Sequence, residues 1–158
     1  METVGEVSLS LETELRFRVD FGLPGVAPVT TDAMPPLGGG LGPDSERLLM
    51  AAVANCLSAS LAFSLRKYRN AEIPMRARAE ARLAPNAQGR LRMQGISVDI
   101  HLGVPADGIR LLERALAQYE DFCTVTQSIR AAFPVVARVF DSEGKLLSGE
   151  AQPAGGGG

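Results

Sequence analysis

Two cysteines, Cys56 and Cys123, are the side chains of this sequence best suited to nucleophilic or redox chemistry. The thiolate form of cysteine attacks electrophiles, including the O–O bond of peroxides, and it also binds metal ions. The one histidine, His101, follows an alternating apolar run, which predicts that it lies on the opposite, solvent-facing side of a strand. Two cysteines and one histidine do not complete a tetrahedral metal site in one chain, so we expect neither a metal ion nor a cofactor.

The two cysteines have different surroundings. Cys56 lies in the middle of an apolar helix expected over residues 44–68, where a cysteine is often only a small buried hydrophobic residue. Cys123 lies between two expected helices, just before a helix N-terminus, where free N–H groups favour the thiolate. At this level both a reactive and a structural role remain open for each residue.

The apolar and polar patterning predicts one α+β domain over residues 1–148 and a disordered, low-complexity tail over 149–158. The expected order is β-β-α-β-β-α-α-β, with mostly antiparallel sheet around one central helix. Pro43 or Asp44 caps that helix, which is apolar nearly all round and therefore buried on several sides or packed against a partner chain. The other elements are two strands within 3–21, a long loop over 22–43, strands over 74–84 and 90–102, a helix over 107–121, a short helix capped by Thr124, and a last strand over 134–140.

The glycine-rich part of the long loop, residues 37–43 (LGGGLGP), has the composition of a phosphate-binding loop. It lacks both the GxGxxG spacing and the Lys-Ser/Thr pair of known phosphate loops, so this signal is weak. Long loops in compact domains are usually either functional or disordered.

The composition excludes several partners. The formal net charge of −2 argues against nucleic acid, which requires a surplus of basic residues on one face. The longest apolar stretch, residues 48–65, is interrupted by Asn55 and three serines, so we expect no membrane span. The acidic N-terminus does not have the pattern of a signal peptide, which favours a cytoplasmic protein whose thiols are kept reduced.

Residues 41–57 (LGPDSERLLMAAVANCL) resemble the hallmark of the OsmC/Ohr family, named after osmotically inducible protein C and organic hydroperoxide resistance protein. That hallmark places a glutamate ten positions before a cysteine, as Glu46 and Cys56 are placed here. Cys123, in a C-x-V context after an amphipathic helix, resembles the second family cysteine. The resemblance covers about residues 10–142.

The resemblance implies a thiol peroxidase that reduces organic hydroperoxides. Cys56 would be the peroxidatic residue, and Cys123 would resolve its sulfenic acid as a disulfide, which a lipoyl or thioredoxin-like dithiol then reduces. The implied fold has antiparallel sheets wrapped around a long central helix in an intertwined homodimer with two sites at the interface. Candidate walls of an apolar substrate pocket are Leu57, Leu61, Phe63, Phe122 and Met34.

The family pattern also contains an arginine that activates the thiol and pairs with the glutamate. Residues 19–46 contain no Arg or Lys, so only Arg16 and Arg18 are candidates, and Asp32 stands in the loop where some relatives carry arginine. Without a nearby cation, the Cys56 thiol would react slowly.

Ten helical residues span about 15 Å, so Glu46 reaches a Cys56 only across a dimer or through a break in the helix. The alternative hypothesis is a non-catalytic OsmC-like protein that binds a small apolar or thiol-bearing ligand at the same dimer pocket. A weaker possibility is an accessory subunit whose cysteines are merely buried.

Overall fold

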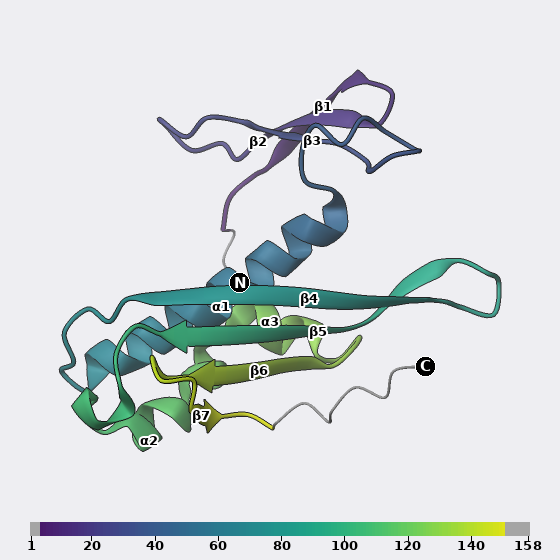
Figure 1. The fold of residues 1–158 in the computed structure, drawn as a ribbon. Helices are drawn as coiled ribbons and strands as arrows, with labels where there is room; N and C mark the ends of the chain where they lie inside the picture. The colour runs from purple at the N-terminus through teal and green to yellow at the C-terminus, as the bar shows by residue number, and fades with distance from the viewer. Residues whose placement is uncertain (1–3, 151–158) are drawn as a thin grey trace. The chain divides into compact units, whose positions relative to one another are not determined.

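The computed structural model describes residues 4–150, and these residues divide into two compact units between Leu49 and Met50 (Figure 1). Most of the expected tail, residues 151–158, lies outside the described residues. The chain has mixed α and β structure with one long helix, as the sequence predicts.

The first unit contains a three-stranded antiparallel sheet in the order β1-β2-β3. Its strands are β1 (Ser8–Thr13), β2 (Arg16–Asp20) and β3 (Val29–Thr31). Strand β3 corrects the expectation of an uninterrupted loop over 22–43, because its β-branched residues pair with the free edge of β2.

Helix α1 (Ser45–Lys67) begins where the sequence places it. The Asp44 carboxylate caps the helix by accepting the Arg47 N–H at 2.9 Å, and Arg66 and Lys67 complement the dipole in the last turn. The helix is continuous from Glu46 to Cys56, so a break does not bring these two residues together.

The second unit contains a four-stranded sheet in the order β4-β5-β6-β7. Its strands are β4 (Met75–Pro85), β5 (Leu91–Leu102), β6 (Val135–Phe140) and β7 (Leu146–Ser148). The β4 and β5 strands match the expected hairpin. One expectation was wrong, because β6 is followed by β7 and is not the last strand. The β5–β6 pair is parallel and the other pairs are antiparallel, so the strands are mostly antiparallel, as expected.

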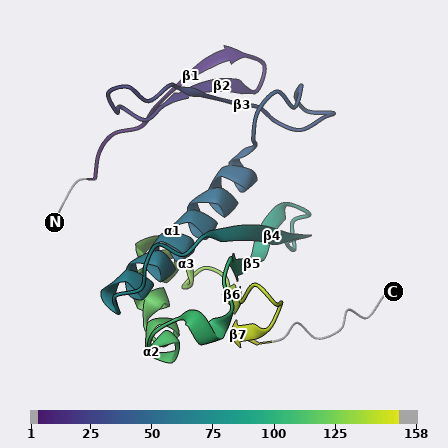
Figure 2. The same ribbon diagram turned by 60° about the vertical axis from the view of Figure 1, so that its left-hand side comes forward.

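Within the second unit, α1 and two short helices, α2 (Leu112–Leu116) and α3 (Thr124–Ile129), cover one face of the sheet (Figures 1 and 2). Alternate residues of β5 point into this core, and the register aligns them with alternate residues of β4 and β6. The buried apolar residues of the helix and of the two central strands are Val53, Leu57, Leu61, Leu65, Ile96, Val98, Ile100, Leu102, Val135, Ala137 and Val139.

The helix expected over 107–121 is wrong. The structure has instead a 3-10 turn η1 (Ala106–Gly108), then α2, then a second 3-10 turn η2 (Tyr119–Phe122). Leu111 adopts a left-handed conformation with φ of 50°, which interrupts the helical path. The residue before α3 is Cys123, so Thr124 is the first helical residue and not the expected cap.

Helix α1 is buried only along one stripe of the second unit, which includes Val53, Leu57 and Leu61. Other residues on it, including Ala51, Ala59 and Phe63, are exposed in the single chain. By length and composition alone, this helix is apolar enough to cross a membrane. That is weak evidence of a membrane span, because the core helix of a soluble protein meets the same criteria.

Candidate thiol site

Cys56 and Cys123, which come from different elements, form a pair in the second unit. Cys56 lies on α1 and is partly exposed, whereas Cys123 lies between η2 and α3 and is completely buried. Both thiols are free, and they lie close enough for the Cys56 side chain to change the pKa of Cys123. One accessible sulfur therefore lies beside one protected sulfur.

The surroundings of Cys123 favour its neutral thiol form. Burial raises the pKa of the Cys123 thiol, and its hydrogen bond with Cys56 raises the pKa further. The hydroxyl of Thr126, 3.0 Å from Cys123 Sγ, and the Thr126 backbone N–H act in the opposite direction without reversing the shift. The Cys123 thiol itself donates to the Thr126 hydroxyl oxygen at 3.0 Å.

Two aromatic side chains lie close to the thiol-bearing segments. Phe63 on α1 and Phe122, which precedes Cys123, meet edge to face with ring centroids 5.4 Å apart. Both rings remain exposed, by 57% and 43%, and so they offer apolar surface to a ligand. The expected wall residues Leu57 and Leu61 are instead fully buried in the core.

In the first unit, Asp32 is a buried carboxylate that holds Arg16. Arg16 Nε lies 3.5 Å from Asp32 Oδ2, and the same oxygen accepts the N–H groups of Gly39 and Leu41 at 3.2 Å each. The hydrogen bond from the Leu41 N–H is the largest cause that lowers the pKa of Asp32. Burial opposes it, while the charge of Arg16 and the Gly39 N–H add to the lowering.

The glycine-rich loop therefore encloses a carboxylate of this same chain. A Cβ at Gly38 would lie 2.5 Å from the Ala33 carbonyl oxygen and 2.7 Å from Asp32 Oδ1, so the loop needs glycine there. The phosphate-loop composition of this segment did not predict its pairing with Asp32. The available signal was an acidic residue shortly before a run of glycines.

The remaining candidates also belong to the first unit. Glu46, in the first turn of α1, lines a cavity of about 350 Å³ together with Asp32 and apolar residues of β2. Arg18 is exposed on β2, and no acidic residue of the described part of the chain forms an ion pair with it. Arg16, Arg18 and Glu46 thus lie in one unit, and the two cysteines lie in the other.

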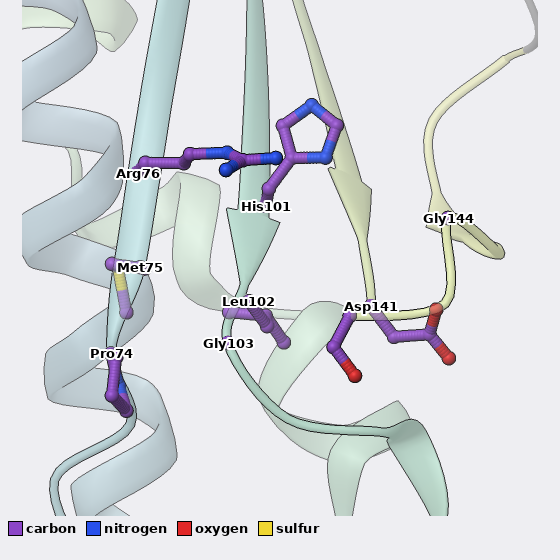
Figure 3. Close-up of a pocket in the computed structure, with 9 residues that line it drawn as sticks. Pro74, Met75, Arg76, His101, Leu102, Gly103, Asp141 and Gly144 are labelled. Atoms are coloured by element: carbon purple, nitrogen blue, oxygen red, sulfur yellow. The ribbon is translucent and has the colours of Figure 1, made fainter.

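A second cavity, of about 510 Å³, lies at the ends of β5 and β6 (Figure 3). His101 lines it and stacks on Phe140, with centroids 4.9 Å apart and 13° between the ring planes. His101 is half-buried and lies on the sheet face opposite the buried Ile100, which confirms the expected side of the strand. Within residues 4–150, no group of three or more His, Cys, Asp or Glu side chains is placed to hold a metal ion.

Comparison with known proteins identifies the family of this chain. The family model described as OsmC-like protein matches residues 38–138, which is more than half of the chain. The chain therefore belongs to the OsmC-like protein family. The search of curated proteins gives no significant match.

Solved structures share this fold. An OsmC-like protein of unknown function from Vibrio cholerae superposes with a TM-score of 0.71 and 15% identity, covering 88% of this chain and 100% of the other. The organic hydroperoxide resistance protein OsmC of Legionella pneumophila gives a TM-score of 0.66 and 16% identity, over 87% and 98% of the two chains. The organic hydroperoxide resistance protein OhrB of Bacillus subtilis gives a TM-score of 0.64 and 17% identity, covering 87% of this chain and 98% of the other.

Proposed function

We propose that this protein is a thiol-dependent peroxidase that reduces organic hydroperoxides through a Cys56 sulfenate and a Cys56–Cys123 disulfide. The observation that carries the proposal is the proximity of a partly exposed thiol to a buried one. A peroxidatic sulfur must meet the substrate, whereas a resolving sulfur must meet only the first sulfur. Two of the similar structures are named organic hydroperoxide resistance proteins, which is consistent with this substrate class.

The proposed reaction proceeds in three steps. The Cys56 thiolate attacks one oxygen of ROOH, the O–O bond breaks, and the alkoxide RO⁻ leaves and takes up a proton to give the alcohol. The Cys123 sulfur then attacks the Cys56 sulfenic acid, which forms the disulfide and releases water. An external dithiol reduces this disulfide by thiol exchange and becomes oxidised itself. We expect a lipoyl or thioredoxin-like dithiol in this role.

Arg16, Arg18 and Glu46 are the residues we propose to activate Cys56. A guanidinium near the sulfur favours the thiolate, and a carboxylate paired with the guanidinium orients it. Glu46 cannot reach Cys56 along the same continuous helix, so we propose that it acts on the cysteine of a second subunit. The exposed apolar residues of α1 support a homodimer, because they would be covered by a partner.

The proposed setting is the cytoplasm, with neither nucleic acid nor a membrane as a partner. Reduced thiols are the normal state of that compartment, and both cysteines are free. No cofactor is required by the three steps above, since the electrons come from the dithiol.

The test is intact mass spectrometry of the reduced protein after one equivalent of cumene hydroperoxide, with hydrogen peroxide and a Cys56→Ser variant alongside. We expect rapid loss of two hydrogen atoms, faster with the organic peroxide and absent in the variant. Free thiols that persist, or oxidation no faster than that of a model peptide, would exclude the peroxidase.

One observation favours a second candidate, a non-catalytic protein that binds a small apolar or thiol-bearing ligand at the dimer pocket. Arg16 is already paired with the buried Asp32, and this pairing reduces the positive charge available to a thiolate. This candidate predicts ligand binding without any change in thiol mass, so the same experiment separates the two functions.

A further inference from the structure

The cavity beside His101 lies where two parallel strands end. The β5 strand ends at Leu102 and β6 ends at Phe140, and residues that follow both strands line the cavity (Figure 3). Crevices beyond the carboxyl ends of parallel strands are recurrent ligand sites in α/β proteins. His101 lies on the face of the sheet opposite its buried neighbour Ile100, whereas α1 covers the other face.

Two nitrogen-bearing side chains converge on the cavity. Arg76 and His101 are directly opposite each other in the β4–β5 ladder, so both side chains leave the same face. Figure 3 shows the Arg76 guanidinium directed toward the imidazole. Among residues 4–150, no acidic side chain forms an ion pair with Arg76.

The other charged groups near this face are already paired. Asp99 binds Arg138 at 2.6 Å, and Arg78 binds Glu80 at 2.6 Å. Asp141, in the cavity wall, accepts the backbone N–H groups of Lys145, Glu143 and Ala106 at 2.9, 3.0 and 3.4 Å, so its charge is already stabilised by backbone. Arg76 is therefore the cation that remains available to a ligand at this cavity.

The rest of the lining is suited to an apolar body. Pro74, Met75 and Leu102 line the cavity beside His101, and the imidazole is held in place by its stacking on Phe140. A ligand could place an oxyanion on the Arg76 guanidinium and a small ring or chain against the apolar side chains. Arginine binds carboxylate and phosphate through paired N–H groups of fixed geometry.

We propose that this cavity is a second ligand site, which binds a small organic molecule bearing a carboxylate or phosphate group, with Arg76 and His101 as the anion contacts. The site is independent of the thiol chemistry, because it uses other residues on the opposite face of the sheet.

The one histidine of the sequence makes the test direct, since the imidazole signal of untagged protein in ¹H–¹⁵N NMR spectra belongs to His101. We would titrate the full chain with benzoate, phenyl phosphate, inorganic phosphate and the neutral analogue benzamide. A saturable shift with the organic anions and none with benzamide is the expected result. The affinities for benzoate and phenyl phosphate show which anion the site prefers. Inorganic phosphate lacks the phenyl ring, so its affinity relative to phenyl phosphate shows how much the ring contributes to binding.

Arg76→Gln should weaken binding of the preferred anion by about tenfold, which is the effect of losing one charge-assisted contact. Arg78→Gln is the matched control, because Arg78 lies two residues away on the same strand face but is paired with Glu80. It should change the affinity less than about twofold. Both side chains are exposed, so neither variant should fail to fold.

Shifts that do not saturate, or equal losses in the Arg76 and Arg78 variants, would overturn the proposal in favour of nonspecific attraction to a basic face.

Discussion

The Cys123 thiol lies beside the Cys56 thiol, although Cys123 is completely buried and Cys56 is partly exposed. The two sulfurs therefore differ in their access to solvent before any substrate arrives. Burial and the neighbouring Cys56 side chain both raise the pKa of Cys123. This asymmetry predicts an order of events in which Cys56 reacts first and Cys123 second.

Removal of the second sulfur should stop the reaction after one turnover. In Cys123→Ser, we expect Cys56 to be oxidised by an organic hydroperoxide and then to remain as a sulfenic acid, because the thiol that would condense with it is gone. Mass spectrometry after dimedone labelling should show one adduct on Cys56. Cys56→Ser should show none, and an adduct on Cys123 in that variant would contradict the assigned roles.

Thr126 should tune the resolving step. Its hydroxyl lowers the pKa of Cys123, so Thr126→Val should raise that pKa and slow disulfide formation about tenfold near neutral pH. Stopped-flow measurement of disulfide closure against pH should show the rate profile displaced to higher pH. Thr124→Val, at an exposed position on the same helix, is the control, and an equal displacement in it would exclude the hydroxyl as the cause.

The two candidate arginines should differ in their effect on peroxide reduction. Arg16 is partly buried and held by Asp32, whereas Arg18 is exposed, so only Arg16 has a fixed orientation. We expect Arg16→Gln to lower the second-order rate with cumene hydroperoxide at least about tenfold and Arg18→Gln to change it less than about twofold. The reverse order would assign activation of the thiol to Arg18.

Asp32 should make stability depend on pH. Its pKa is lowered from the usual 3.8, so its contribution to stability is present above that pH and is lost as the pH falls through the lowered value. Asp32→Asn should therefore be less stable than the parent protein at neutral pH, and the difference should shrink in acid. Urea unfolding from about pH 7 to about pH 3 measures this difference.

The control for that series is Asp20→Asn, which removes an exposed carboxylate that accepts a single N–H from Gly22. Its effect on the urea midpoint should be small at every pH. A stability difference for Asp32→Asn that stays constant down to about pH 3 would mean that the charge of Asp32 does not stabilise the fold.

The sequence alone determined the elements whose signals are local. Helix α1, its Asp44 cap and the β4–β5 hairpin were predictable, because side-chain periodicity, caps and turn residues act within a few positions. The same reasoning placed His101 on the outer face of its strand, and residue chemistry singled out Cys56 and Cys123 as candidates for reactive side chains.

Only the tertiary structure decided the features that depend on contacts between residues far apart in the sequence. The three-residue strands β3 and β7 carry too little pattern to be predicted and exist because a neighbouring strand offers them an edge. The left-handed turn at Leu111 likewise overrides a helical pattern. The contact between the two thiols, and the enclosure of the Asp32 carboxylate by glycine backbone, also arise only when segments far apart in the chain pack together, because no local periodicity records which distant group a side chain will meet.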